Sequence, residues 1–144
     1  MADKITLEQR RKTMQSIRSQ SKLENEVSKL LWKEGYRFRK NVKTLFGTPD
    51  ISIKKYKVVI FIDSCFWHVC EIHGHLPKTN SDFWEKKLRK NQERDMKVST
   101  YYKENGWHIL RVWEHEIKLD PILTIKKISA FIENAKKDFY KNKI

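Results

Sequence analysis

Residues 65–75, CFWHVCEIHGH, gather side chains that bind metal ions and transfer protons. The segment holds both cysteines of the chain and three of its five histidines. Three residues have the spacing C-x4-C-x2-H, and a fourth candidate lies further on, in WEHE: Cys65, Cys70, His73 and His115. Four such ligands in a tetrahedron form a closed structural zinc site. His75 is a rival ligand, and in the alternative interpretation Cys65 is only a buried apolar residue.

His68 belongs to the same segment but is not needed to complete a set of four zinc ligands. An imidazole near carboxylates suits general acid or base chemistry on water or on a leaving oxygen. Phe66 and Trp67 directly precede it, and Phe83 and Trp84 come soon after. Core packing accounts for some of these aromatic residues, whereas exposed ones in a basic protein stack on bases or wedge between them.

Two carboxylates have positions suited to a divalent metal ion. Metal-dependent phosphodiester cleavage needs oxygen ligands that hold Mg²⁺ against the scissile phosphate. Asp50, in GTPD, opens one strand of an expected hairpin, and Asp63 closes the apolar strand VVIFI, so the hairpin brings them together. A carboxylate at the end of a buried strand is costly unless it is paired or metal-bound. The alternative for Asp50 is an ordinary Pro-Asp turn.

Asp95 lies on the inward stripe of an expected helix. The stripe repeats at steps of three and four residues: Trp84, Leu88, Asn91, Asp95, Val98 and Tyr102. An inward aspartate either forms a buried salt bridge with Arg or Lys or orients a catalytic histidine. Glu24 has a local explanation, because Ser21 and Glu24 fit the S-x-x-E capping box of a helix start.

Periodicity and turn residues outline the elements that must hold these side chains. "VVIFI" is apolar without alternation, as in a strand buried on both faces. The expected order is helix, helix, three strands, helix, strand and helix, and it predicts an α/β sheet flanked by helices. The corresponding residues are 6–20, 21–35, 36–42, 49–53, 58–63, 80–106, 107–114 and 120–144.

Composition indicates the kind of partner. The chain has 144 residues and a formal net charge of +13, which favours a polyanion: nucleic acid first, an anionic membrane surface second. No apolar run approaches the roughly 20 residues of a membrane span, and MADKITLEQRRK lacks the apolar stretch of a signal peptide. We therefore expect a cytoplasmic, nucleoid-associated protein of bacterial type, in which cysteines are thiols or metal ligands.

Four blocks, GTPD, VVIFIDSCFWH, PKTNSDFWEKKLRKNQERD and GWHILRVWEHE, stand in an order and spacing that carry a family resemblance. Through them the sequence resembles the very-short-patch repair (Vsr) DNA mismatch endonucleases. The resemblance implies a restriction-endonuclease-like mixed sheet of the PD-(D/E)xK superfamily, a structural zinc, and a Mg²⁺-dependent nick of one strand 5′ to the thymine of a T:G mismatch.

The resemblance also assigns roles to individual residues. Asp50 matches the magnesium-binding aspartate, and Ile62 matches a residue whose backbone carbonyl contributes to the same site. His68 matches the catalytic histidine, Asp95 its carboxylate partner, and Glu24 a first-helix glutamate near the metal waters. The residues that match DNA-intercalating aromatic residues are Phe66, Trp67 and Trp84.

This chain departs from the family pattern in two places that bear on the metals. The best-studied branch has a histidine where Asp63 stands, so Asp63 is either an extra magnesium ligand or a replacement with altered metal demand. That branch also arranges its zinc ligands as C-x4-H-x-C with a final cysteine, instead of Cys65, Cys70, His73 and His115. In addition, IDSC lacks the lysine of the D/E-x-K pattern, so His68 or a metal must take over its role.

The sequence predicts a single, monomeric endonuclease domain over residues 1–144, divided into a basic N-terminal arm (1–20), a catalytic core (21–120) and a C-terminal helix (121–144). The expected partner is double-stranded DNA with a mismatch, mismatch-repair proteins or a DNA methyltransferase are candidate protein partners, and no membrane contact is expected. Two alternatives remain: a restriction- or transposon-associated nuclease that acts on undamaged DNA, and a non-catalytic zinc-stabilised DNA-binding module.

Overall fold

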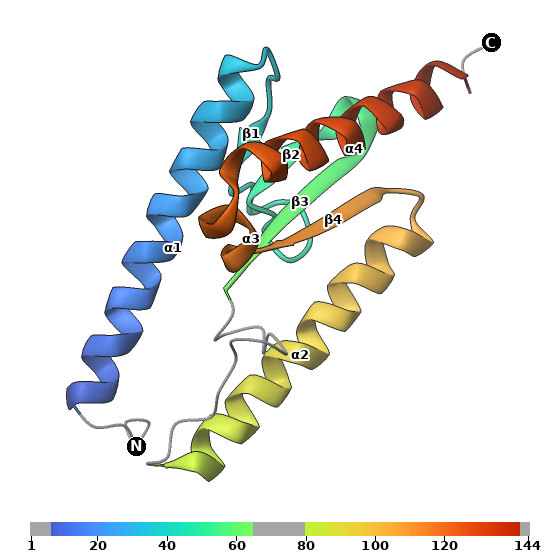
Figure 1. Cartoon of the computed structure of the whole chain (residues 1–144). Helices are drawn as coiled ribbons and strands as arrows, with labels where there is room; N and C mark the ends of the chain where they lie inside the picture. The colour runs from blue at the N-terminus through green and yellow to red at the C-terminus, as the bar shows by residue number, and fades with distance from the viewer. Residues whose placement is uncertain (1–6, 65–79, 142–144) are drawn as a thin grey trace.

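The computed structural model describes residues 7–64 and 80–141. A four-stranded sheet lies between helices (Figure 1). Its elements are α1 (Leu7–Lys33), β1 (Arg39–Lys40), β2 (Ile51–Ile53), the 3-10 helix η1 (Lys54–Tyr56), β3 (Val58–Asp63), α2 (Ser81–Glu104), β4 (His108–Trp113), α3 (Glu114–Leu119) and α4 (Pro121–Lys141).

The strands form a mixed sheet in the order β1-β2-β3-β4. β2 pairs antiparallel with β1 and β3, whereas β3 and β4 pair in parallel across the α2 crossover. This confirms the predicted mixed α/β sheet flanked by helices. The hairpin of β2 and β3 is also confirmed, although β1 is only two residues long and both are exposed.

β3 is buried on both faces, as its uninterrupted apolar sequence predicts. Val58, Ile60 and Ile62 belong to a core shared with α1, α3 and α4. Val59 and Phe61 point to the opposite face, where Val98 and Tyr102 of α2 cover them. The alternation of side chains along a strand divides one apolar run between two cores.

The N-terminal region forms one helix where the sequence predicts two. α1 runs from Leu7 to Lys33 without interruption and passes through the expected boundary at residues 20–21. The segment contains neither glycine nor proline, so nothing in it breaks the backbone hydrogen bonds. Ser21 and Glu24 therefore lie inside a helix, and the capping-box interpretation of this pair is wrong.

A second difference is the short helix α3 between β4 and α4, which begins where the predicted strand was expected to end. The Glu116 carboxylate accepts a 2.8 Å hydrogen bond from the backbone N–H of Trp113, which closes a capping box at the helix start. The strand thus ends within WEHE, because the contact between Trp113 and Glu116 starts a helix there. Within residues 7–64 and 80–141, no helix is long and apolar enough to cross a membrane.

Candidate active site

The hairpin places Asp50 next to the end of β3, as predicted. Asp50 precedes β2, whose register pairs Ile51 with Ile60. The backbone N–H of Ile62, two residues further along β3, donates a 2.6 Å hydrogen bond to Oδ2 of Asp50. Asp63 is the last residue of β3 and is buried. Asp50, just before β2, and Asp63, at the end of the adjacent β3, therefore lie close together at one end of the sheet.

A cavity of about 350 Å³ opens at this end. Side chains from α1, α2, β3, β4 and the loop before β2 line it. Its polar lining includes Glu24, Asp50, Asp63, Asn91, Asp95 and Arg111. The cavity thus unites four carboxylates that the sequence analysis selected separately, on elements that are far apart in the chain.

The GTPD loop is held against α2 by close packing. Gly47 has a φ of +75°, and a Cβ built there would lie 2.8 Å from Cγ2 of Val98. Only glycine combines that backbone conformation with so close an approach. The hydroxyl of Tyr102 donates a hydrogen bond to the Phe46 carbonyl in the same loop. These contacts with α2 hold the loop in place, and the loop in turn sets the position of Asp50.

Asp50 has a strongly perturbed acidity. Burial is the main cause that raises the pKa of its carboxyl to about 8, and the charge of Glu24 and a hydrogen bond with Glu24 raise it further. The Ile62 N–H opposes the shift, while the charge of Asp63 adds to it. Two carboxyl groups this close retain a proton between them unless a cation compensates their charge.

Glu24 reaches the site because α1 packs its C-terminal half against the sheet. Leu23, Val27 and Leu31 are buried in the core, and Glu24, next to Leu23, is half-buried at the cavity. The sequence resemblance places Glu24 near the metal waters, whereas the local S-x-x-E pattern assigns it to a helix cap. In the structure Glu24 lies beside Asp50, with a hydrogen bond between their carboxyl groups.

Arg111 is a residue of this cavity that the sequence analysis missed. It stands in the middle of β4, and its guanidinium contacts both carboxylate oxygens of Asp63, at 2.9 and 3.1 Å. The signal that could have found it is the arginine itself, in the apolar strand HILRVW. A charge in the middle of a covered strand requires a partner of opposite charge.

Several predicted site residues lie outside the described residues, and their geometry remains a prediction: Cys65, Phe66, Trp67, His68, Cys70, His73 and His75. Two others are described. His115 stands in α3 with its ring stacked near that of Trp113, at a centroid distance of 6.4 Å. Trp84 is only 2% exposed and meets Phe83 edge to face at 5.3 Å.

The carboxylates of the cavity are the candidate ligands for the predicted magnesium ion. Over residues 7–64 and 80–141, no group of three or more His, Cys, Asp or Glu side chains could hold a metal ion. Asp50 and Glu24 nevertheless form a close pair of hard oxygen donors. Mg²⁺ is usually held by one or two carboxylates together with waters and substrate phosphates, so this pair fits that ion.

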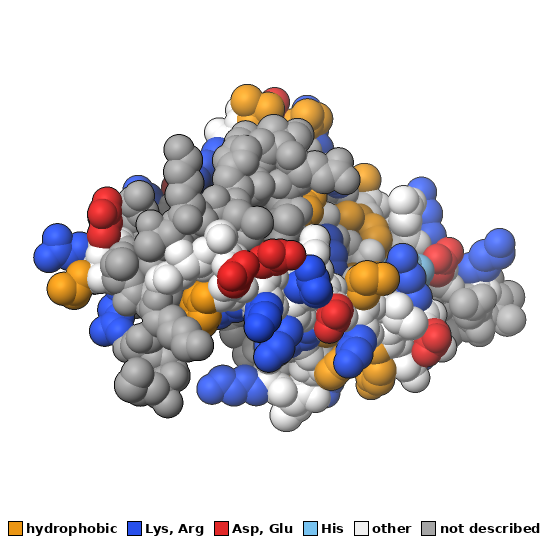
Figure 2. Space-filling view, turned by 90° about the horizontal axis from the view of Figure 1, so that it is seen from below, with side chains coloured by type: hydrophobic (Ala, Val, Ile, Leu, Met, Phe, Trp, Pro, Cys, Tyr) orange, Lys and Arg blue, Asp and Glu red, His pale blue; other side chains and the backbone are white. Residues whose placement is uncertain are grey.

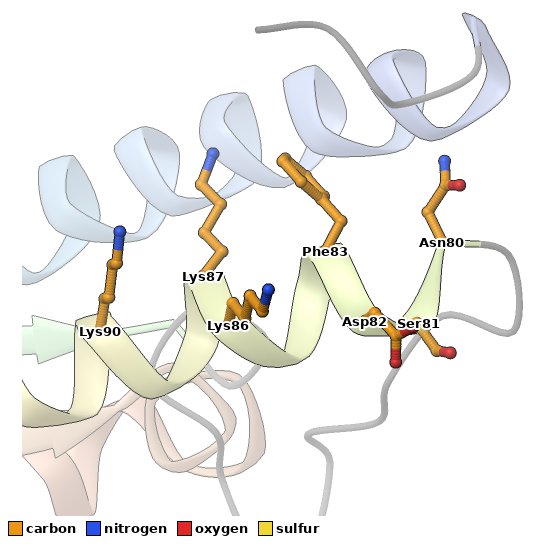
Figure 3. A pocket seen from close by; sticks show the side chains of 7 residues that line it. All are labelled: Asn80, Ser81, Asp82, Phe83, Lys86, Lys87 and Lys90. Carbon is orange, nitrogen blue, oxygen red and sulfur yellow. The ribbon is translucent and has the colours of Figure 1, made fainter.

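A second, basic cavity of about 780 Å³ lies at the start of α2 (Figure 3). Lys86, Lys87 and Lys90 line it with Phe83 and residues 80–82. Basic side chains also gather on the face of the molecule seen in Figure 2. The N-terminal halves of α1 and α2 both extend past the end of β3 where Asp63 stands (Figure 1). A polyanion at this end would meet positive charge beside the carboxylates.

The sequence of this chain matches one protein family and several known nicking enzymes. The family described as DNA mismatch endonuclease Vsr matches residues 2–73. Type II nicking enzyme V.HpaIIP of Haemophilus parainfluenzae is 43% identical over 137 residues, which span 92% of this chain and 94% of the relative. Type II nicking enzyme V.NmeAIP of Neisseria meningitidis is 46% identical over 121 residues, 82% and 86% of the two chains. DNA mismatch endonuclease Vsr of Escherichia coli is 34% identical over 139 residues, 92% and 86%.

These matches identify the chain as an endodeoxyribonuclease, whose partner is DNA. The chain belongs to the Vsr DNA mismatch endonuclease family. The resemblance carried by the four sequence blocks is thereby confirmed, and the matches favour an enzyme over the alternative of a non-catalytic DNA-binding module.

Proposed function

We propose that this endonuclease has the restriction-endonuclease-like fold and nicks one strand of duplex DNA 5′ to the thymine of a T:G mismatch, with Mg²⁺ held at Asp50. The observation that carries the proposal is the Asp50–Glu24 carboxylate pair at the end of β3, with the pKa of Asp50 raised to about 8. Support for the mismatch comes from the Escherichia coli relative, which is a DNA mismatch endonuclease.

Asp50 and the backbone carbonyl of Ile62 are the proposed magnesium ligands, with Glu24 beside the metal waters. The N–H and C=O of one residue in a strand point to the same side. Since the Ile62 N–H bonds to Asp50, its carbonyl is directed to the same side of β3. When bound, the ion would polarise a phosphate oxygen and acidify a water molecule.

His68 is the proposed general acid or base, and Asp95 the residue that orients it. Asp95 lines the cavity from the inward face of α2, as its place in the stripe predicts. A carboxylate that accepts one imidazole N–H fixes the tautomer in which the other nitrogen exchanges a proton with substrate or water.

Phe66, Trp67 and Trp84 are proposed to wedge into the duplex beside the mismatch. Unstacking costs least where pairing is already weak, so a wedge favours mismatched sites. Because Trp84 is buried in the present structure, its part in the wedge requires a rearrangement at the start of α2 when DNA binds.

A structural zinc ion held by Cys65, Cys70, His73 and His115 is proposed to support this wedge. His115 is the second residue of α3, which follows β4, so the ion would tie the segment with the aromatic residues to this edge of the sheet. A loop fixed in this way keeps its residues in position against strained DNA.

The decisive experiment is a nicking assay with purified protein, Mg²⁺, a labelled T:G heteroduplex and a matched duplex. We expect one nick on the thymine strand of the heteroduplex only. Equal cutting of the matched duplex would instead indicate a nuclease for undamaged DNA. Asp50→Ala should abolish nicking but leave DNA binding, and retained cleavage by this variant would contradict the metal assignment.

A further inference from the structure

Arg111 connects three elements at the centre of the cavity. It lies on β4 in register with Phe61 of β3, and its guanidinium carbon stands 4.6 Å from the centre of the Phe61 ring. The side chain is 23% exposed, so it is largely removed from water. Stacking on an aromatic face holds the plane of a guanidinium and so sets the direction of its N–H groups.

Three nitrogens of this guanidinium have separate partners. Nη1 contacts both carboxylate oxygens of Asp63, Nη2 donates to the backbone carbonyl of Asp95 at 3.2 Å, and Nε donates to the Ser99 hydroxyl at 3.0 Å. The Asp95 carboxylate lies 3.8 Å from Nη1. One arginine thus links the end of β3 to the middle of α2, and the planar fork that this requires is absent from lysine.

The Asp63 carboxylate is therefore already neutralised by a protein cation. Only 5% of its side chain is exposed, and both of its oxygens lie within 3.1 Å of Nη1. A divalent ion bound to the same oxygens would stand close to the guanidinium and be repelled by it in a cavity of low dielectric constant. Asp50 differs, because its partners are a backbone N–H and another carboxyl group, which a cation would stabilise.

We propose that Arg111 is a positioning residue of the nuclease site, which neutralises Asp63, keeps it out of the magnesium ligand set and holds Asp95 toward the cavity. Asp63 then replaces the histidine of the best-studied branch without becoming a magnesium ligand. Asp50 binds the cation without a contribution from Asp63. This inference rests on the proposed magnesium site at Asp50.

Metal binding separates this role from a merely structural one. The full chain is titrated with Mn²⁺, a hard divalent probe, and the free ion is followed by EPR in the absence of DNA. Asp50→Asn should abolish Mn²⁺ binding, and this loss identifies the measured site as the one at Asp50. Asp63→Asn should leave its affinity within about twofold. Arg111→Gln exposes the Asp63 charge and should tighten binding about tenfold or add a second ion, and Arg111→Gln with Asp63→Asn should return to the wild-type affinity.

Nicking of the T:G heteroduplex gives the second readout. Arg111→Gln should lower kcat about 10- to 100-fold, with KM little changed, and Arg111→Lys should recover part of the loss. A tenfold loss of Mn²⁺ affinity in Asp63→Asn would overturn the inference, and this variant decides the matter even if Arg111→Gln does not fold. Unchanged Mn²⁺ affinity and kcat in a folded Arg111→Gln would overturn it as well. A wild type with no Mn²⁺ site sensitive to Asp50→Asn would instead contradict the proposed function.

Discussion

The backbone N–H of Ile62 donates a 2.6 Å hydrogen bond to Oδ2 of Asp50, so the candidate metal-binding carboxylate is tied to the strand that carries Asp63. The bond aligns Asp50 with the end of β3 and lowers the pKa of its carboxyl. Burial and the neighbouring Glu24 outweigh this effect, so the pKa of Asp50 remains raised. Ionisation of Asp50 therefore costs stability in the folded protein, and the proposed cation would offset this cost.

Asp50→Asn should stabilise the protein in EDTA while it abolishes nicking. Asparagine preserves the acceptor for Ile62 and offers a donor to Glu24, yet carries no charge. Because the folded pKa of Asp50 is raised from 3.8 to about 8, ionisation in the unfolded state weakens the wild type as pH rises through this window. The advantage of the variant should therefore grow from pH 5 to pH 8 and reach about 1–3 kcal/mol.

Thermal unfolding at several pH values checks this prediction. Magnesium should raise the midpoint of the wild type and leave that of Asp50→Asn unchanged. A variant less stable than the wild type in EDTA at pH 8 would contradict it.

Gly47→Ala should destabilise the protein and displace the GTPD loop. The new methyl would meet Val98 at 2.8 Å, and the φ of +75° is unfavourable for alanine. We expect a loss of about 3 kcal/mol in the free energy of unfolding, from overpacking and backbone strain together.

Gly106→Ala is the matched control for that substitution. Gly106 has a φ of +74°, but no atom lies within 4 Å of its added Cβ. Gly106→Ala should lower the free energy of unfolding by about 1–2 kcal/mol, because only backbone strain contributes and not overpacking. Urea denaturation measures both, and equal losses in the two variants would show that Val98 does not constrain the loop. Nicking should fall in Gly47→Ala and persist in Gly106→Ala.

Glu116→Gln should weaken the junction of β4, α3 and α4 in a pH-dependent manner. Burial alone would raise the pKa of Glu116, but the Trp113 N–H and the Lys127 ammonium outweigh it and lower the pKa overall. A lowered pKa contributes stability above the unfolded value of 4.5, which is lost as pH falls through the folded value.

The expected loss at pH 7 is about 0.5–1 kcal/mol, because the group is partly exposed. The difference between Glu116→Gln and the wild type should shrink toward pH 3–4. Chemical denaturation at pH 7 and pH 4 provides the measurement, and a difference that widens in acid would be inconsistent with this origin.

Elemental analysis should find about one zinc ion per chain. Cys65→Ser and Cys70→Ser should lower thermal stability before they affect the chemical step, because the proposed ion holds the fold and not the substrate. His73→Ala should behave like them and His75→Ala should not. A fully folded wild type without zinc would refute the assignment.

Lys86→Ala and Lys90→Ala should weaken DNA binding about equally for matched and mismatched duplexes. Both residues line the basic cavity at the start of α2, and removing one lysine–phosphate interaction should reduce the slope of log affinity against log salt by about one. Lys126→Ala, an exposed lysine of α4, removes the same charge elsewhere. Fluorescence anisotropy at several salt concentrations distinguishes them, and equal effects of all three would exclude a local interaction with the phosphates.

Periodicity and composition determined the elements and part of the site. The uninterrupted VVIFI predicted a strand covered on both faces, and the stripe of α2 correctly pointed Asp95 inward. These features depend on neighbours a few residues apart, whose spacing the sequence states directly. The hairpin likewise followed from the short connection between β2 and β3, and it brought Asp50 to Asp63.

Only the tertiary structure decided which distant groups share the cavity. Glu24 approaches Asp50 because α1 is one unbroken helix packed on the sheet, a position that its local capping pattern misrepresents. Arg111 reaches Asp63 because β3 and β4 pair in parallel, in a register that brings Arg111 beside Phe61. Electrostatic partners are selected by distance in space, and pairing and packing set that distance between residues far apart in the chain.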